Sequence, residues 1–246
     1  MRVTRTGARH DGSEDDALLA LFRAIASRDD REVALRLDQS HDVAIRPIHI
    51  GATRDYAKTY FLPSIHHYVY SGDTALHFSA AAHQRRLAES LVIKGAGVRA
   101  RNRRGAEPLH YAADGGPAAN GWDSVAQSDV ITYLIEAGAD PNALDKSGVA
   151  PLHRAVRNRC SMAVSALIDN GADPLLMNKS GSTPMHLAVQ NTGKSNSGAD
   201  AAKDEQARII ALLLQHGASP GDVDAKGKTV ADAASSDWIR TQLDRV

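Results

Sequence analysis

The sequence predicts an all-α solenoid, built from stacked helix-turn-helix units with projecting β-hairpin or loop fingers. Two regularities support this prediction. A short motif that ends in histidine recurs along the chain, and a Gly-Ala pair recurs in constant phase with it. A sequence that repeats itself every 20–50 residues or so is typical of a stack of one supersecondary unit, in which each unit buries its apolar face against its neighbours.

The first regularity is a six-residue motif that runs from a glycine to a histidine. It ends at His77, His110, His153 and His186, and a degenerate fifth copy, GKTVAD, ends at Asp232. The intervals between these positions are 33, 43, 33 and 46 residues. The second and fourth units therefore carry extra residues.

The second regularity shows where those extra residues enter. Gly-Ala pairs begin at Gly95, Gly138, Gly171 and Gly217, and each begins ten residues before the glycine of the next motif. All length variation therefore falls between a motif and its Gly-Ala pair. We expect a rigid junction and an expandable loop in every unit, as a stacked architecture requires.

The unit that begins at Gly181 shows the expected local structure. Thr183 can cap a helix whose first position is Pro184, which suits proline. A second helix with apolar periodicity (IIALLL) follows from Ile209 and ends at Gly217, where glycine can adopt the left-handed conformation that closes a helix. About ten turn-rich residues then lead to a glycine that suits a hairpin-like turn with positive φ.

Two units depart from this pattern at the helix start. Glu107 and Ala150 stand where the capping threonine is expected. Each replacement should weaken its helix cap by about 0.5–2 kcal/mol.

The pattern resembles the ankyrin repeat, a unit of about 33 residues with a T-P-L-H-x-A signature. The resemblance covers the chain from roughly Gly72 to the C-terminus. It implies two antiparallel helices and one projecting finger in each repeat. It also implies that the repeat histidines hydrogen-bond the backbone and tie neighbouring repeats together.

We expect five regions along the chain. They are a disordered N-terminal tail (1–14), an N-terminal capping helix pair (15–45), an irregular insert (46–71), four full repeats that start near 72, 105, 148 and 181 (72–227), and a C-terminal capping repeat (228–246). Two shapes are open for the insert, a lengthened finger loop or an extra helix at YAKTYFLPS. The order of the two loop insertions, 114–128 and 191–205, is also open.

Composition narrows the class of protein. The 246 residues include 29 basic and 29 acidic side chains, so the absence of net charge argues against global steering toward nucleic acid or membrane. The one cysteine, Cys160, cannot form an intramolecular disulfide, which indicates a reducing compartment. The longest clear apolar helical runs have six residues, far below the ~20 that span a bilayer. We expect a soluble, cytoplasmic monomer.

The residues give no sign of catalysis. The sequence has no Gly-rich phosphate loop, no G-x-S-x-G and no H-E-x-x-H motif. The repeat histidines are spread along the stack rather than converging on a metal, and Cys160 is expected to be an inert thiol. We expect no enzyme activity, no cofactor and no metal.

The resemblance implies a protein–protein interaction module or scaffold, whose partner contacts the finger tips and the first helix of each pair. Candidate contact residues are Arg99, Arg101, Arg103, Arg104, Lys146, Ser147, Val149, Arg157, Asn158, Lys179, Ser180, Gln190, Trp122 and Tyr60. The positions carried over from the family also include Ala81, Ala82, Ala106 and Asp114.

Two of these groups have an alternative interpretation. The arginines of finger 99–104 suit an acidic segment of a partner, because guanidinium pairs bidentately with carboxylate, or they merely solvate a turn. The aromatic residues between Tyr56 and Tyr70 form an interface or bury the junction between the cap and the first repeat. Trp122 suits an exposed contact in a flexible loop. The alternative function is nucleic-acid binding through the basic finger 99–104.

Overall fold

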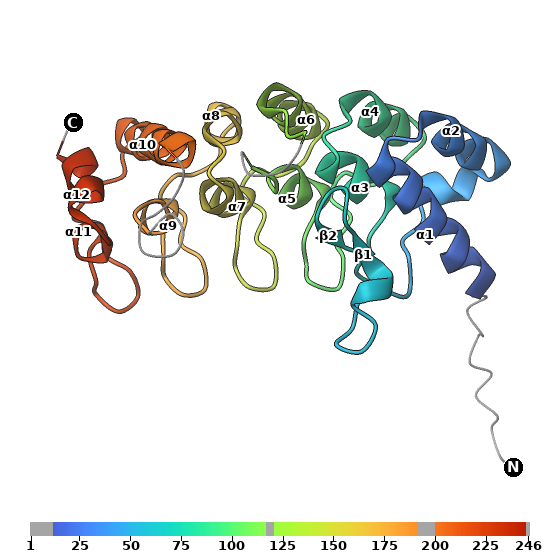
Figure 1. Cartoon of the computed structure of the whole chain (residues 1–246), viewed down its shortest axis with the longest axis horizontal. Coiled ribbons are helices and arrows are strands. Elements are labelled where there is room, and N and C mark those ends of the chain that lie inside the picture. Colours follow the sequence, from blue (N-terminus) through green and yellow to red (C-terminus); the bar gives the residue numbers. More distant parts are fainter. Residues whose placement is uncertain (1–11, 117–120, 191–199, 245–246) are drawn as a thin grey trace, which may run out of the picture.

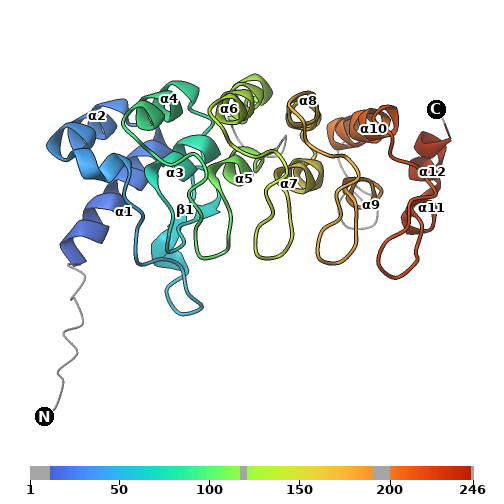
Figure 2. The ribbon, with the colours of Figure 1, turned by 180° about the vertical axis from the view of Figure 1, so that it is seen from behind.

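Helix pairs stacked in a single file form an elongated, two-layered solenoid (Figures 1 and 2). This computed structural model describes residues 12–116, 121–190 and 200–244. The predicted all-α solenoid is confirmed.

Six helix pairs make up the described stack. They are α1 (Gly12–Ser27) with α2 (Asp30–Gln39), α3 (Ala75–Ala81) with α4 (Arg85–Ile93), α5 (Pro108–Ala112) with α6 (Ser124–Glu136), α7 (Pro151–Asn158) with α8 (Ser161–Asp169), α9 (Pro184–Ala188) with α10 (Asp200–Gln215), and α11 (Val230–Ala233) with α12 (Asp237–Leu243).

The helices form an outer and an inner row, and the fingers project below the inner row. Helices α2, α4, α6, α8 and α10 form an outer row, and α3, α5, α7 and α9 form the inner row beneath it (Figure 1). Below the inner row, the loops that join one pair to the next project side by side as fingers. We call the exposed side of the inner row, together with the fingers, the concave surface.

One continuous apolar core runs through the stack. The cluster of buried hydrophobic side chains extends from Leu18 in α1 to Leu243 in α12. Alanines such as Ala80, Ala112 and Ala155 lie in it without exposed surface, and they let neighbouring inner helices pack closely. Helix α3 accordingly packs on α5, and α7 on α9.

The repeat histidines complete the helix starts. In α9, the Thr183 hydroxyl accepts a hydrogen bond from the His186 backbone N–H at 3.4 Å, and His186 Nδ1 accepts one from the Thr183 N–H at 3.3 Å. This reciprocal pair is a capping box in which histidine stands where glutamate is usual. The histidine half persists at Glu107 and Ala150, where the threonine is missing.

The insert 46–71 is a lengthened finger rather than an extra helix. After the 3₁₀ turn η1 (His41–Ala44) the chain runs without helix to a second 3₁₀ turn, η2 (Lys58–Tyr60). It then forms a short antiparallel hairpin, in which β1 (Phe61–Leu62) pairs with β2 (His67–Tyr68). The helix considered for YAKTYFLPS is therefore wrong, because this stretch contains only one 3₁₀ turn before the strand.

Some expected boundaries shift. Helix α1 begins at Gly12, inside the range expected to be a disordered tail. Helices α6 and α10 begin at Ser124 and Asp200, so both loop insertions end in helix. Residues 1–11, 117–120 and 191–199 lie outside the described part of the chain, and the expectations that fall on them stay predictions.

Candidate protein-binding surface

Each finger is built around one asparagine or aspartate at its base. In the finger that contains Lys146, Asp145 Oδ1 accepts hydrogen bonds from the backbone N–H groups of Ser147 at 2.8 Å and Val149 at 3.0 Å. The same two bonds form at Asn178, which accepts from Ser180 and Ser182. These side chains fold the finger tip into a fixed turn, so the residues at the tip project outward in every repeat.

The sequence carries a signal for this position that the histidine motif and the Gly-Ala pair do not include. Asn102, Asp145, Asn178 and Asp224 each lie three positions before a finger glycine. Only a side chain with an oxygen on Cγ reaches the N–H groups two and four positions further on, which explains why the position alternates between asparagine and aspartate.

Neighbouring fingers touch through backbone. The Lys146 N–H donates to the Arg104 carbonyl oxygen at 2.8 Å. Lys179 Nζ donates in turn to the Lys146 carbonyl, one finger further along. Hydrogen bonds therefore link the three fingers that carry Arg104, Lys146 and Lys179.

The repeat histidines join each inner helix to the next finger. Nε2 of His110 lies 3.0 Å from the Val149 oxygen, and Nε2 of His153 lies 3.2 Å from the Ser182 oxygen. His77 and His186 make the equivalent contacts. The implied structural role of these histidines is confirmed.

The predicted arginine finger 99–104 is engaged within the chain. Arg99 lies 3.4 Å from the Asp140 carboxylate, and Arg101 lies 3.4 Å from that of Glu107. The guanidinium groups of Arg103 and Arg104 lie 5.2 and 5.0 Å from the centre of the Tyr70 ring. Arg104 also donates to the Tyr70 hydroxyl at 2.9 Å, and Arg103 donates to the Ala52 carbonyl. The four side chains remain exposed, but two of them hold the insert in place.

The insert covers the inner row at its N-terminal end. His67 in β2 stacks on Tyr111 of α5 with the ring centres 4.7 Å apart, and Tyr111 is buried. Every residue of α3 is buried as well. Ala81 and Ala82, expected to face a partner, are therefore inaccessible, and so is Ala106.

The aromatic side chains of the insert pack mainly against one another. The rings of Phe61 and Tyr68 lie 4.8 Å apart, those of Tyr68 and Tyr70 lie 6.4 Å apart, and Tyr60 packs partly against the core. Tyr56 and Tyr68 are exposed by 64% and 39%, and the other three rings are half-buried. Of these rings only Tyr60 packs against the core, so both expected roles of the cluster, an interface and a buried junction, stay predictions.

The inner row opens at α7. Arg157 in α7 is exposed, and so is Gln190, which follows α9. Asn158 is half-buried and donates to Asp114 Oδ1 at 3.1 Å. On the neighbouring fingers, Lys146, Ser147, Lys179 and Ser180 are exposed, whereas Val149 is half-buried. We call Arg157, Asn158 and Gln190 the open inner face.

An ion-pair cluster borders the open inner face. Arg154 binds Asp114 Oδ2 at 2.7 Å and Asp145 Oδ2 at 3.1 Å. Burial acts to raise the pKa of Asp145, but hydrogen bonds from Val149 N–H and from Arg154 outweigh it and lower that pKa. Arg154 thus joins the end of α5 to the next finger, a contact that residue spacing alone did not reveal.

Trp122 and Cys160 both point inward. Trp122 is half-buried, and its indole N–H donates to Gln127 Oε1 at 2.8 Å, so the expected exposed contact is wrong. Cys160 is buried with its Sγ 2.6 Å from the Gly115 oxygen, and burial raises the pKa of its thiol to about 12. A thiol with such a pKa is unreactive near neutral pH.

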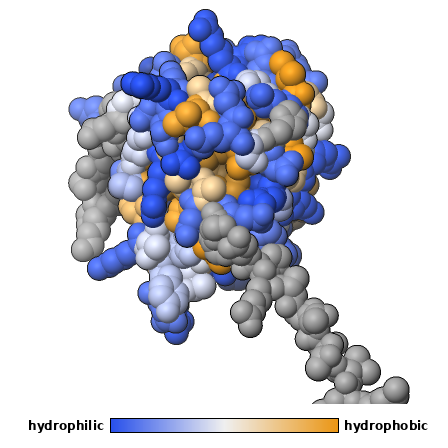
Figure 3. All heavy atoms as spheres, turned by 90° about the vertical axis from the view of Figure 1, so that its right-hand side faces the viewer, coloured by the Kyte–Doolittle hydropathy of each residue, from blue (hydrophilic) through white to orange (hydrophobic). Residues whose placement is uncertain are grey.

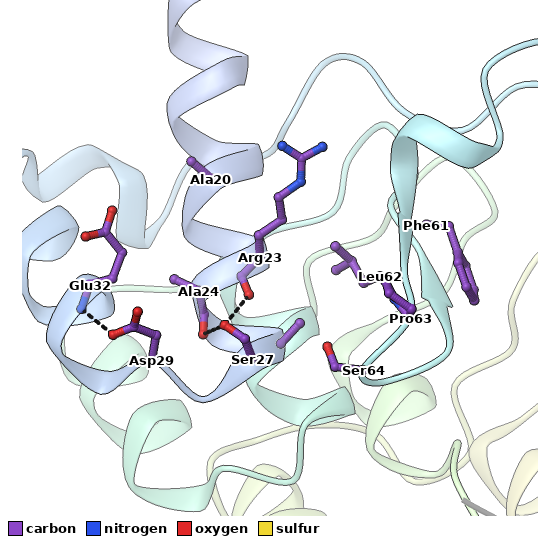
Figure 4. Close-up of a pocket in the computed structure, with 11 residues that line it drawn as sticks. Ala20, Arg23, Ala24, Ser27, Asp29, Glu32, Phe61, Leu62, Pro63 and Ser64 are labelled. Carbon is purple, nitrogen blue, oxygen red and sulfur yellow. Dashed lines mark hydrogen bonds between the residues drawn. The ribbon is translucent and has the colours of Figure 1, made fainter. Parts of the chain in front are cut away.

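A shallow cleft of about 440 Å³ lies between α1 and the β1–β2 hairpin (Figure 4). Its polar groups are satisfied locally: the Ser27 hydroxyl donates to the Arg23 oxygen at 2.9 Å, and Asp29 accepts from the Glu32 N–H at 3.0 Å. The surrounding end of the stack mixes apolar and polar side chains, as Figure 3 shows, with Leu35 half exposed. These local contacts give no indication of a catalytic site in the cleft.

The described residues lack two further kinds of feature. None of their helices is long and apolar enough to cross a membrane. Residues 12–116, 121–190 and 200–244 hold no group of three or more metal-binding side chains.

The fold and the concave surface define a class of protein, a repeat scaffold that presents side chains from its fingers and inner helices. The family model "Ankyrin repeats (3 copies)" matches residues 118–198, and the model "Ankyrin repeat" matches residues 180–228. Residues 118–228 of the chain therefore contain ankyrin repeats. Ankyrin repeats indicate a protein–protein interaction module, and the family is typically non-catalytic.

One curated relative shares the repeats. The chain is 39% identical over 88 residues to the E3 ubiquitin-protein ligase KEG of Arabidopsis thaliana. The match covers 36% of this chain and spans only 5% of the length of that relative. It extends over the repeats alone.

Proposed function

We propose that this protein recognises a partner protein through the open inner face and the fingers beside it, and that it acts as a non-catalytic interaction module or scaffold. One observation carries the proposal. The insert contacts the inner row at α5, where His67 stacks on Tyr111, and both α3 and α5 are buried throughout, whereas Arg157 and Gln190 beyond them are exposed. A partner that follows the concave surface therefore meets accessible side chains from α7 onward.

The chemistry of this surface suits a protein partner. It combines a guanidinium, two side-chain amides and short finger hydroxyls, which together donate and accept hydrogen bonds, and arginine is enriched at interface hot spots. The expectations of a monomer and of a cytoplasmic location belong to the same proposal.

Nucleic-acid binding through finger 99–104 has weaker support. Arg103 and Arg104 hold Tyr70, and Arg99 and Arg101 each face a carboxylate. Asp140 and Glu107 offset the charges of Arg99 and Arg101, which leaves two of the four cations for a phosphate backbone.

A capture experiment tests the proposal. The wild type and an Arg157→Glu/Gln190→Glu variant serve as baits in a nuclease-treated lysate of the source organism. An Arg31→Glu/Arg86→Glu variant on the outer helices α2 and α4 is the control, since both arginines are exposed. We expect a protein that the wild type and the control retain and the inner-face variant loses. Equal retention by all three baits would contradict the proposal.

A further inference from the structure

The fingers carry a row of cations that is separate from the residues of the open inner face. Arg103, Lys146 and Lys179 each lie two positions before the finger glycine, in three consecutive fingers. The last finger adds Lys226 and Lys228. All five side chains are exposed, and we call them the finger edge.

No lysine of the finger edge has a carboxylate within ion-pair distance, although Asp224 interacts with Lys226 and Asp232 with Lys228 at longer range. Within the described part of the chain, none of Lys146, Lys179, Lys226 and Lys228 forms an ion pair with a carboxylate. Lys179 donates to a carbonyl oxygen, which leaves its charge uncompensated.

Three carboxylates near the finger tips are engaged within the chain. Asp145 is bound to Arg154 and to two backbone N–H groups. Asp224 accepts the N–H groups of Lys226 and Lys228 at 2.8 and 2.9 Å. Glu107 is buried beside Arg101. The outward-facing charge of the row is therefore positive, although the chain as a whole has a formal net charge of zero.

The distance between cations on neighbouring fingers determines which shape of ligand fits the row. Packed helices lie about 8–10 Å apart, and the fingers follow the same repeat. An extended peptide in the polyproline II conformation advances about 3.1 Å per residue and has three residues per turn, so every third side chain lies on the same side. One carboxylate at every third residue of an extended peptide therefore matches one cation on each finger.

We propose that the finger edge binds an extended acidic segment of the partner protein, with carboxylates about three residues apart, laid across the finger tips. The inference rests on the proposed function and specifies that the bound segment of the partner is acidic and extended. Duplex DNA carries one phosphate charge per ~1.7 Å of its axis, so a single file of cations about 10 Å apart neutralises it poorly. A sparsely charged peptide suits the row better.

A peptide of defined spacing tests the inference. The probe is a fluorescent 12-residue peptide made of four Ser-Gly-Glu units, and its binding is followed by fluorescence anisotropy at 50 and 150 mM salt. A peptide of the same composition with its four glutamates contiguous measures the contribution of spacing, and a 12-nucleotide single-stranded DNA measures general affinity for polyanions. The protein variants are Lys146→Glu/Lys179→Glu, its neutral counterpart Lys146→Gln/Lys179→Gln, and Arg31→Glu/Arg86→Glu on the outer helices.

We expect the spaced peptide to bind more tightly than the contiguous peptide and than the DNA. The Lys→Glu pair should weaken binding by about tenfold or more, the Lys→Gln pair should weaken it less, and the outer-helix control by less than about twofold. Circular dichroism melting verifies that each variant is folded.

Three outcomes would overturn the inference: no binding of the spaced peptide, equal losses in the finger and outer-helix variants, or tighter binding of the DNA that the Lys→Glu pair abolishes. None of these outcomes affects the interpretation of the capture experiment, because that experiment alters Arg157 and Gln190 and leaves the lysines in place. A partner that is captured through the inner face while the peptide fails would remove this inference and leave the proposed function standing.

Discussion

Nε2 of His186 lies 3.3 Å from the carbonyl oxygen of Lys228, which joins the last inner helix of the full repeats to the finger that follows it. At the next equivalent position the chain has Asp232, which accepts the Thr229 N–H at 3.2 Å. Aspartate retains the cap of α11 but cannot reach a further finger. The described residues hold no further finger beyond α11 for the side chain at this position to contact.

The histidine contacts predict a loss of stability in acid. Burial lowers the pKa of His77 to about 3 and those of His83 and His110 to about 4. An unfolded histidine titrates near 6.5, so the unfolded state binds about one more proton per histidine between pH 6.5 and 4, and stability falls as the pH falls.

Asp73 acts in the opposite direction. Burial raises its pKa to about 7 from an unfolded value of 3.8, so this group favours folding more at low pH than at high pH. With three histidines against one aspartate, we expect a net loss of about 2–3 kcal/mol per pH unit between pH 6 and 4.5. Urea unfolding at several pH values measures this slope, and a constant free energy of unfolding over that range would contradict the neutral, buried state of the histidines.

Removing one repeat histidine should destabilise the stack. His153→Ala leaves the Ala150 N–H and the Ser182 oxygen without their partner, and we expect a loss of about 2–4 kcal/mol. His216→Ala is the control, because His216 is exposed and should change stability by less than about 0.5 kcal/mol. Equal effects of the two substitutions on the urea midpoint would show that the histidine tie contributes nothing.

Alanine substitutions at two finger glycines distinguish the stability cost of backbone strain from the cost of a steric clash. Gly148 and Gly227 have similar φ values, +68° and +74°. A Cβ on Gly148 would lie 2.7 Å from the Lys179 nitrogen of the next finger, whereas a Cβ on Gly227 would meet nothing within 4 Å. Gly227→Ala should therefore cost about 1–2 kcal/mol from its left-handed backbone alone. Gly148→Ala should cost clearly more, and equal melting temperatures would rule out close stacking of the fingers.

The finger turn predicts an asymmetric response at Asn178. Asn178→Asp retains the Oδ1 acceptor that Asp145 and Asp224 provide in the equivalent positions, so stability should change by less than about 0.5 kcal/mol. Asn178→Ala removes the acceptor of two N–H groups and should cost about 1–2 kcal/mol. Thermal melting of both variants makes the comparison, and an alanine variant as stable as the aspartate variant would show that this side chain does not hold the turn.

The sequence predicts the stack but only part of the surface. The motif ending in histidine and the Gly-Ala pair report local structure, because a cap and a left-handed helix end depend on a few neighbouring residues. The contact of Arg104 with Tyr70, or of Arg154 with Asp114, joins residues far apart in the chain, and no local pattern encodes it. The insert 46–71 lacks the repeat period, so its position over α5 could not be derived from that period.

The proposed function requires a partner protein to contact the concave surface from α7 onward. Photo-cross-linking with benzoylphenylalanine in place of Arg157, compared with the same probe in place of Arg86 on the outer helix α4, tests this contact most directly. We predict a cross-linked partner from position 157 and none from position 86. Cross-linking from position 86 alone would place recognition on the outer helices and contradict the proposed function.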